Sequence, residues 1–305
     1  MNYQVEKLIS PVSGSGNVLK IGRLSKKWLM KWYKKIYNVD IAYLFKDIDE
    51  ISMYKCLDTG YEFYYPFVEG DELFYEKLQV EKKDYYRDWK WENEVILPFI
   101  REGSSVLDIG CGAGGFLSNL QNKLSGLTVR GLEFNEKAIE AASQKGIYVT
   151  KETVAEHALT YGDNYDVVCS FQVLEHIACV RAFITDCIKL LKPGGLLIFS
   201  VPNNDSFQGY YKYDVLNKPP HHAGRWNDQS LKSIADIFNI KFLCTLTQPM
   251  SHVPLTPILG VLLHNEFIAD ILLNKLRLRF LFRSFSEKIA GSIKGHTIVA
   301  LYVKH

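Results

Sequence analysis

The sequence predicts an α/β protein built on a doubly wound, mostly parallel sheet of seven strands, with a small N-terminal appendage and helical insertions. Strand-like apolar runs alternate with helix-like segments from about residue 105 onward, which is typical of right-handed strand–helix–strand crossovers. A glycine-rich turn at residues 110–115 separates the first of these strands from its helix. With 305 residues, 47% hydrophobic residues and a net charge of +2, the composition is that of an ordinary globular protein and gives no reason to expect a nucleic-acid partner.

The glycine-rich turn predicts a site for a small ligand, because glycine leaves no Cβ in the way and adopts positive φ without penalty. Gly110, Gly112 and Gly115 fit the dinucleotide pattern G-x-G-x-x-G, whereas Gly110, Gly112 and Gly114 fit G-x-G-x-G equally well. Glu133 ends the next strand, 23 residues after Gly110. Both a nicotinamide site and an S-adenosylmethionine site need a carboxylate there for ribose hydroxyls, so these residues leave both cofactors open.

Neighbouring motifs favour one of the two cofactors. Asp108 stands in the strand before the glycines, Asp166 lies at the start of a strand over 165–170, and the runs Phe171–His176 and Leu190–Gly195 follow. In this order and spacing the motifs closely resemble those of the class I S-adenosylmethionine-dependent methyltransferases over about residues 85–204. The resemblance implies a Rossmann-like fold, S-adenosylmethionine as cofactor and methyl transfer as the reaction.

Residues 1–70 are expected to form an N-terminal segment, and residues 71–305 the methyltransferase domain. The runs Ser10–Ser15 and Cys56–Tyr61 are knuckle-like turns, and cysteines at positions 10, 13 and 59 would complete a zinc ribbon with Cys56. Many methyltransferases that act on sugars carry such a ribbon, so this segment resembles one that has lost its metal; a pair of ordinary turns is the alternative. Between them, the basic and aromatic run Leu24–Tyr37 is interpreted as a helix with a solvated face.

Residues 71–102 are predicted to be helical, because apolar and aromatic residues recur there at helical spacing. In the resembling family a helix at this place lies over the cofactor. The resemblance therefore implies that Tyr85, Tyr86 and Arg87 reach the methionine carboxylate, and packing of the aromatic rings on the sheet is the alternative.

The core is expected to follow as strands and helices in alternation. Strands are expected at Ser105–Ile109, Thr128–Leu132, Ile147–Thr150, Tyr165–Ser170, Leu196–Val201, Lys241–Thr247 and His296–Val303. Helices are expected at Gly115–Leu124, Glu136–Lys145, Cys179–Leu191 and Gln229–Phe238.

Two insertions interrupt this core. Residues 203–226 are polar, aromatic and proline-bearing, and a long connection at the cofactor end of a sheet predicts a substrate loop. Some methyltransferases of glycan and secondary-metabolite clusters have a Pro-Pro-His-His run followed by a tryptophan here, which Pro219–Trp226 resembles. Residues 254–290 alternate aliphatic and basic residues, a pattern that fits a lid, a dimer contact or peripheral contact with a membrane.

Candidate cofactor residues follow from the strand ends. Glu133 is expected to accept both ribose hydroxyls and Phe134 to cover an adenine face. Asp108 is expected to be buried behind them, bonded to turn amides or through water to the cofactor amine. The resemblance places Val154, within the segment 153–156, at the adenine edge, with an exposed helix acid as the alternative for Glu156.

Candidate catalytic residues lie near the fourth strand and in the substrate loop. Phe171 and Gln172 close that strand beside the reactive methyl, without the Asn/Asp-Pro-Pro-Tyr motif of amino-group methyltransferases. His221 and His222 are the best candidates for a general base, with at most one expected to face the cleft; helix capping is the alternative. His176 is expected to bond the backbone. No metal is expected, because no Asp/Glu–His cluster at ligand spacing accompanies the two loop histidines.

Together these features predict an O-methyltransferase that acts on a small molecule, a sugar or a glycan-linked precursor. C-methylation of a nucleotide sugar, an NAD-dependent oxidoreductase that lacks an obvious Tyr-x-x-x-Lys pair, and a non-catalytic binding subunit are the alternatives. Six cysteines without framework spacing suit reduced thiols, and no signal region or apolar run of transmembrane length is found. A cytoplasmic location is therefore expected.

Overall fold

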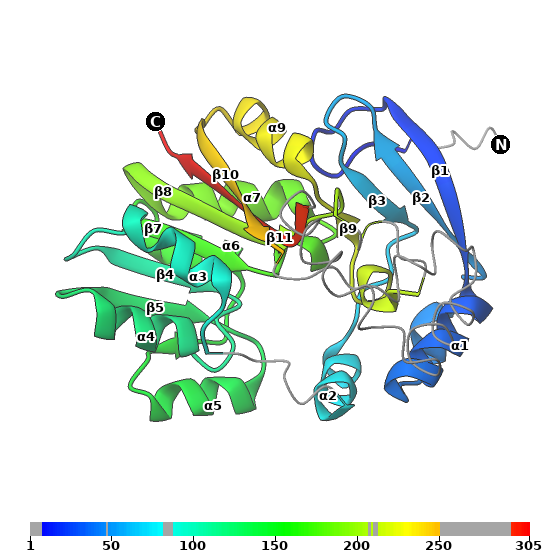
Figure 1. Cartoon of the computed structure of the whole chain (residues 1–305), viewed down its shortest axis with the longest axis horizontal. Helices are drawn as coiled ribbons and strands as arrows, with labels where there is room; N and C mark the ends of the chain where they lie inside the picture. Colours follow the sequence, from blue (N-terminus) through cyan, green and yellow to red (C-terminus); the bar gives the residue numbers. More distant parts are fainter. Residues whose placement is uncertain (1–7, 47, 82–87, 207–208, 210–212, 251–293) are drawn as a thin grey trace, which may run out of the picture.

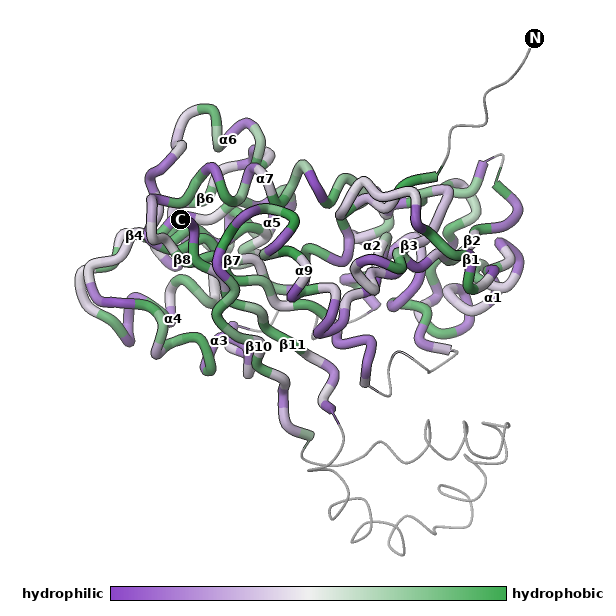
Figure 2. Tube along the Cα trace, turned by 90° about the horizontal axis from the view of Figure 1, so that it is seen from above, coloured by the Kyte–Doolittle hydropathy of each residue, from purple (hydrophilic) through white to green (hydrophobic). Residues whose placement is uncertain are grey.

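The computed structural model describes residues 8–46, 48–81, 88–206, 209, 213–250 and 294–305. It contains a seven-stranded sheet and a four-stranded sheet (Figure 1). Seen from above, the four-stranded sheet and its helix lie to one side of the seven-stranded sheet (Figure 2).

The seven-stranded sheet has the order β10-β11-β8-β7-β4-β5-β6. Its strands are β4 (Ser105–Ile109), β5 (Thr128–Leu132), β6 (Val149–Thr150), β7 (Tyr165–Phe171), β8 (Leu191–Pro202), β10 (Lys241–Pro249) and β11 (Lys294–Val303). The strands from β8 to β6 pair in parallel, whereas β11 runs antiparallel to both β8 and β10. The predicted fold class is confirmed, and β4 and β5 have the predicted bounds.

Helices cover both faces of this sheet, because successive side chains of a strand point to opposite faces. In β4, Leu107 and Ile109 pack in one apolar core with α6, α7 and α9, whereas Val106 packs in a second core with α3, α4 and α5. These helices are α3 (Trp91–Ile96), α4 (Gly115–Lys123), α5 (Glu136–Gln144), α6 (Val154–Tyr161), α7 (Val180–Leu190) and α9 (Asp228–Phe238). The alternation therefore separates the two cores within a single strand.

The four-stranded sheet is antiparallel and has the order β1-β2-β3-β9. Its strands are β1 (Val18–Ser25), β2 (Glu50–Cys56), β3 (Glu62–Tyr65) and β9 (Gly224–Arg225). Because β9 comes from the predicted substrate loop, that loop is tied to the N-terminal segment. The division of the chain at residue 70 stays a prediction.

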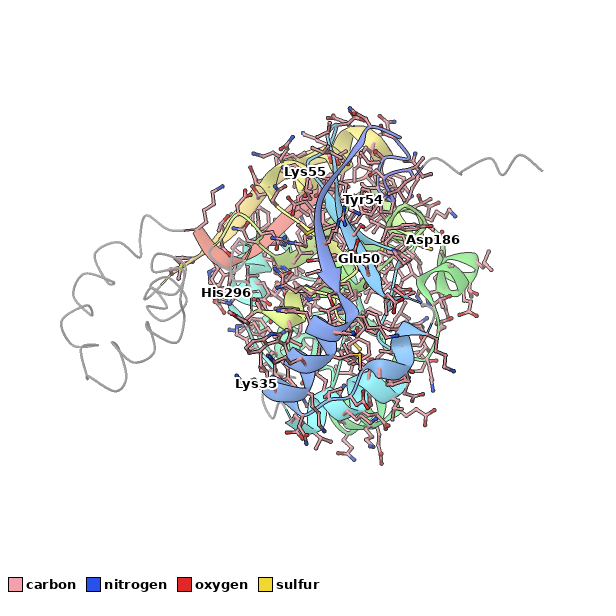
Figure 3. The ribbon with its side chains drawn as sticks, turned by 90° about the vertical axis from the view of Figure 1, so that its right-hand side faces the viewer. Lys35, Glu50, Tyr54, Lys55, Asp186 and His296 are labelled. Carbon is pink, nitrogen blue, oxygen red and sulfur yellow. The ribbon has the colours of Figure 1, made fainter. Side chains whose placement is uncertain are left out.

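Helix α1 (Lys26–Tyr37) lies next to this sheet and is more buried than expected. Leu29 and Tyr33 are fully buried in a third apolar core, together with Phe45 and Phe74. Lys35 on the same helix is exposed (Figure 3). The interpretation as a solvated helix face therefore holds for only one side of α1.

Two helical predictions differ from the structure. The continuous helix expected over 71–102 is two helices, α2 (Glu72–Glu81) and α3. Helix α6 was not predicted; it begins after Thr153, whose side chain and that of Glu156 form a reciprocal capping box. Of the two alternatives for Glu156, the adenine edge or an exposed helix acid, the structure therefore supports the helix acid.

Two sequence predictions fall outside the described residues. These are the cofactor contact of Tyr86, with its neighbours Tyr85 and Arg87, and the insertion at 254–290. Within the described ranges, no helix combines the length and the apolar character needed to cross a membrane.

Candidate active site

The turn after β4 lets the backbone line a cavity. Gly110, Gly112 and Gly114 have φ angles of 75°, 54° and 67°, a region that other residues rarely adopt. A Cβ on Gly110 would lie 2.5 Å from a methyl carbon of Val173, so a side chain has no room there. Gly110 and Gly112 line the cavity, whereas Gly114 precedes α4 and packs against Ala142. The expected close approach of backbone to ligand therefore belongs to the first two glycines.

Glu133 is held by backbone amides at the end of β5. One carboxylate oxygen accepts hydrogen bonds from the N–H groups of Phe134 (2.8 Å) and Asn135 (3.0 Å), and the other accepts from Gly112 (2.9 Å). Glu133 lines the cavity beside Phe134, whose side chain is 58% exposed. A fixed carboxylate and an open ring beside a glycine cradle fit the ribose and adenine of S-adenosylmethionine.

Asp108 is buried behind the glycine turn and reaches the cavity wall. Its Oδ1 accepts from Sγ of Cys169 at 3.8 Å, and its expected bonds to turn amides or through water to the cofactor amine stay a prediction. Burial raises the pKa of Asp108 to about 8, because the interior disfavours the charged carboxylate.

Phe171 and Gln172 line the cavity at the end of β7. The Gln172 side-chain amide donates to Oγ of Ser200 (2.9 Å), and its backbone has a φ of 58°. Val154 packs in the apolar core and is not among the described residues that line the cavity, so its place at the adenine edge stays a prediction.

The cavity has a volume of about 1020 Å³, which is large enough for a nucleoside cofactor together with an acceptor. Helix α2 contributes to its wall: the Tyr75 hydroxyl lies 3.3 Å from Nδ1 of His176, and Oε1 of Gln79 accepts from Nδ2 of Asn135 (3.1 Å). Sequence reasoning missed Tyr75 and Gln79. Their spacing of four residues, which places both on one helix face, was the available signal.

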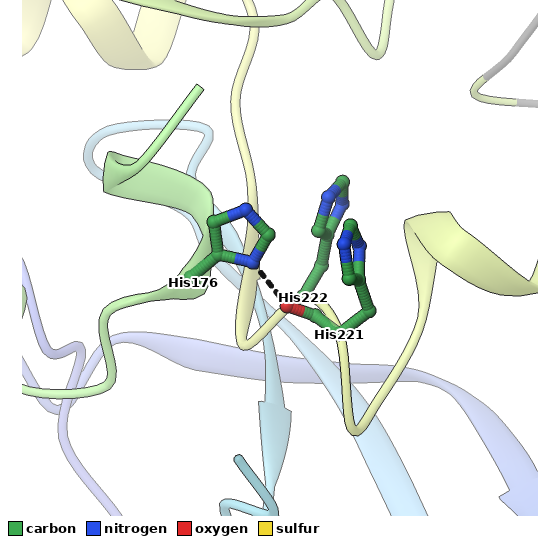
Figure 4. Close-up of side chains that lie close together, drawn as sticks. All are labelled: His176, His221 and His222. Carbon is green, nitrogen blue, oxygen red and sulfur yellow. Dashed lines mark hydrogen bonds between the residues drawn. The ribbon is translucent and has the colours of Figure 1, made fainter. Parts of the chain in front are cut away.

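Three histidines that line the cavity lie close together (Figure 4). One ring nitrogen of each lies within 4.8 Å of those of the others. His176 belongs to the short 3-10 helix Leu174–His176 after β7, whereas His221 and His222 belong to the substrate loop and are 8% and 5% exposed. Both loop histidines line the cavity, although at most one was expected to face it. The fold thus brings residues about 45 positions apart into one cluster.

Hydrogen bonds fix the tautomers of two of these rings. Nδ1 of His176 bonds the carbonyl oxygen of His221, which is the backbone contact expected for His176. Nδ1 of His221 lies 2.9 Å from the carbonyl oxygen of Leu216. Because a carbonyl oxygen only accepts, both Nδ1 atoms carry the hydrogen, and in a neutral ring Nε2 keeps its lone pair.

The tautomer of His222 follows from a chain of bonds that begins at Arg225. The Arg225 guanidinium only donates, so the atom of Asn204 that it contacts at 2.9 Å is the amide oxygen. This oxygen also accepts from Nδ2 of Asn217 (2.8 Å), which leaves Oδ1 of Asn217 facing Nδ1 of His222 (3.1 Å). Nδ1 of His222 therefore donates, and its Nε2 also keeps a lone pair.

Glu175 stands beside these rings and is 2% exposed. Its Oε1 lies 3.9 Å from Nε2 of His176 and 4.0 Å from Nε2 of His222, and its Oε2 has no hydrogen-bond partner in the described part of the chain. Burial raises the pKa of Glu175 to about 8. Burial also lowers the pKa of His176 to about 4 and that of His222 well below its usual value, so both rings are uncharged at neutral pH.

The two N-terminal turns also meet in space. Oγ of Ser13 lies 3.5 Å from Sγ of Cys56. Burial raises the pKa of the Cys56 thiol, but hydrogen bonds from Ser13, Thr59 and Ser10 outweigh it and hold that pKa below its usual value. One thiol among three hydroxyls lacks the ligand set of a structural zinc site. The descent of this segment from a zinc ribbon stays a prediction.

Comparisons with known proteins agree with this geometry. Residues 82–247 match the family described as "Methyltransferase domain". The ubiquinone biosynthesis O-methyltransferase of Proteus mirabilis is 38% identical over 169 residues, which cover 49% of this chain and 68% of that protein. The protein of the same name from Agrobacterium fabrum is 41% identical over 107 residues, which cover 33% of this chain and 42% of that protein.

A solved structure of a SAM-dependent methyltransferase from Archaeoglobus fulgidus has the same fold. It superposes with a TM-score of 0.50 at 18% identity, over 77% of this chain and 100% of that chain. The family match extends over more than half of the chain and includes the glycine turn, Glu133 and the end of β7. The chain belongs to the methyltransferase-domain family and is an S-adenosylmethionine-dependent methyltransferase.

Proposed function

We propose that this enzyme methylates a hydroxyl group of a hydrophilic small molecule, with a sugar or glycan-linked precursor as the acceptor class. The observation that carries the proposal is the polar lining of the cavity. Glu69, Asp71, Glu72, Asp214 and Asn217 all lie on the cavity wall. Carboxylate and amide oxygens accept hydrogen bonds from hydroxyl groups, so this wall suits an acceptor with several hydroxyls.

When bound, S-adenosylmethionine supplies a methyl group on a positively charged sulfur, and the C–S bonding pair leaves with the sulfur as a bond to the acceptor forms. The protein has to hold donor and acceptor in line and exclude water. Helix α2 lines the cavity through Tyr75 and Gln79, and a hydrogen bond to Ser200 holds the Gln172 side chain at the end of β7. The proposed base is Nε2 of His222, which carries no hydrogen and would accept the hydrogen of the acceptor hydroxyl. His221 is the second candidate.

A phenolic hydroxyl is the second candidate acceptor, because the curated relatives are named for ubiquinone biosynthesis. C-methylation of a nucleotide sugar would need a carbon made acidic by a neighbouring ketone, and no observation favours it. The family match sets aside the NAD-dependent oxidoreductase.

The proposal is tested with methyl-labelled S-adenosylmethionine and a panel of nucleotide sugars, free sugars and catechols, read by mass spectrometry. Label is expected in a sugar hydroxyl. Label in catechols alone would replace the acceptor class with phenols, and label in none of the hydroxyl compounds would contradict O-methylation of these classes. A thermal shift with S-adenosylhomocysteine but not NAD is the control for a folded cofactor site.

A further inference from the structure

We propose that His176, His222 and Glu175, with His221 beside them, form a binding site for a divalent transition-metal ion at the acceptor side of the cavity. Metal binding itself does not depend on the proposed function. The role of the ion, which is to bind the acceptor hydroxyl, does rest on the proposed function. The ion would sit next to the place where the hydroxyl has to lose its proton.

The first argument is the convergence of ligand atoms. Oε1 of Glu175 lies 3.9 Å from Nε2 of His176 and 4.0 Å from Nε2 of His222. One ring nitrogen from each of His176, His221 and His222 also lies within 4.8 Å of the other two. Two imidazoles and one carboxylate are a common ligand set of catalytic zinc and non-haem iron sites, which leave open positions for substrate.

The second argument is the outer layer of hydrogen bonds. Histidines that bind a metal almost always donate their other N–H to a carbonyl or carboxylate, which fixes the ring and its tautomer. All three histidines do so here, towards the carbonyl oxygens of His221 and Leu216 and the amide oxygen of Asn217. The Arg225–Asn204–Asn217 chain holds the last of these oxygens in place.

The third argument is an excess of acceptors. Oε1 of Glu175 faces two Nε2 lone pairs, and its Oε2 has no partner among the described residues. No Lys or Arg of the described chain pairs with this buried carboxylate; its recorded ion-pair contacts are the two histidines. Three acceptors that face one another need a proton or a cation between them. A proton on Glu175 can serve only one of the two Nε2 atoms, whereas a cation would satisfy all three groups at once.

The matched comparison is His157, a buried histidine elsewhere in the chain that also contacts a glutamate. Its Nδ1 lies 2.8 Å from Oε1 of Glu152 and its Nε2 lies 2.8 Å from the Tyr165 hydroxyl, so both ring nitrogens have partners. His157 thus has no ring nitrogen left for a ligand, whereas Nε2 of His222 faces the carboxylate of Glu175.

Ligand chemistry favours zinc-like ions. Imidazole suits Zn²⁺, Fe²⁺ and Co²⁺, whereas Mg²⁺ and Ca²⁺ prefer oxygen ligands. The rings of His221 and His222 stack with an interplanar angle of 24°. Because the nitrogen lone pairs lie in these nearly parallel planes, the two rings cannot bind one ion unless one of them rotates. The contact with Glu175 ranks His222 ahead of His221. With the ion bound, Nε2 of His222 is a ligand and no longer the base. The ion would polarise the acceptor hydroxyl and lower its pKa, and the hydroxyl proton would pass to Oε2 of Glu175.

The test uses the full chain, stripped of metal with a chelator and titrated with Co²⁺, which is read by its visible absorption and by elemental analysis after gel filtration. One Co²⁺ per chain is expected. His222→Ala and Glu175→Gln should each weaken binding by more than about 100-fold, and Asn217→Ala by about 10–100-fold. His296→Gln, which changes an exposed histidine on β11, should bind like the parent (Figure 3).

Variants are compared only if they bind S-adenosylhomocysteine like the parent, which shows that the fold is intact; if His222→Ala fails this criterion, Glu175→Gln and Asn217→Ala carry the test. Less than one Co²⁺ per chain, or binding that all three variants keep, would overturn the metal site. Full methyl transfer by the stripped protein in chelator would also overturn the metal's role, while leaving the proposed function standing. Stoichiometric metal without transfer to any hydroxyl would overturn the proposed function and leave the metal site.

Discussion

The two sides of the cavity differ in how their polar groups are satisfied. At the glycine turn, the carboxylate of Glu133 accepts three backbone N–H groups and needs nothing more to hold its place. At the histidines, Glu175 and the Nε2 atoms of His176 and His222 face one another as acceptors. Backbone amides alone therefore satisfy the carboxylate of Glu133, whereas a single proton on Glu175 cannot serve both ring nitrogens that face it. Substitutions on the two sides should accordingly affect different steps.

The largest effect is expected on the acceptor side. His222→Ala should lower turnover by roughly 10²–10⁴, because the group beside the acceptor hydroxyl is lost. Affinity for S-adenosylhomocysteine, measured by calorimetry, should stay close to that of the parent. His296→Gln is the control. A double variant of His221 and His222 that turns over normally would remove this cluster from the mechanism.

On the cofactor side, Glu133→Ala should weaken S-adenosylmethionine and S-adenosylhomocysteine binding by roughly 1–3 kcal/mol, through loss of charge-assisted hydrogen bonds. The control is Glu140→Ala, which removes an exposed acid from the neighbouring helix α5. Calorimetry should show this loss in the binding constant. If Glu133→Ala binds both ligands as tightly as the control does, Glu133 is not a cofactor ligand.

Between the two sides, Asp108 should make stability depend on pH. Its pKa is raised from 3.8 to about 8, so the stability it contributes is present below about pH 4 and is lost as the pH rises through 8. Asp108→Asn cannot ionise. Its free energy of unfolding should therefore rise relative to the parent between those pH values, by roughly 1–3 kcal/mol in urea titrations.

Asp166 serves as a control because its pKa is shifted in the opposite direction to that of Asp108. Burial raises its pKa, but hydrogen bonds from Ser105 and Lys192 and the Lys192 charge outweigh it and hold that pKa below the usual value. Its contribution to the free energy of unfolding is present above pH 3.8 and is lost as the pH falls. Equal pH profiles for Asp108→Asn and Asp166→Asn would contradict the assignment of Asp108 as a buried neutral acid.

The smallest effect is expected far from the cavity. Cys56→Ser should leave the metal content of the protein unchanged, because one thiol with Ser10, Ser13 and Thr59 cannot hold a structural zinc. Elemental analysis of this variant beside His222→Ala checks the point. A loss of zinc in Cys56→Ser but not in His222→Ala would move the metal from the cavity to the N-terminal turns.

The same contrast explains what could be predicted from sequence. The cofactor side is local: a strand, a glycine turn and a helix are consecutive, and Glu133 ends the next strand, so periodicity and turn chemistry are sufficient. The acceptor side is not local. The loop of His221 and His222 reaches Glu175 through long-range contacts: β9 pairs with β3, and the N–H of Ala223 donates to the carbonyl oxygen of Glu175. No short pattern encodes these contacts.

Other differences have the same cause. Burial of Leu29 and Tyr33 depends on a third core that also includes Leu216, far along the chain. Helix α6 could have been predicted locally, since Thr153 and Glu156 form a capping box. It was missed because its eight residues give only a short periodic pattern. For the metal, the sequence expectation considered only ligands near His221 and His222, whereas Glu175 and His176 lie about 45 residues away along the chain.

The most direct test of the account is to locate the transferred methyl group. Methyl-labelled S-adenosylmethionine is incubated with the parent enzyme and an accepted sugar or glycan precursor, and the product is examined by NMR. The account predicts the label on a hydroxyl oxygen, with transfer lost in His222→Ala at unchanged S-adenosylhomocysteine affinity. A label on carbon, or equal transfer to oxygen by His222→Ala, would contradict it.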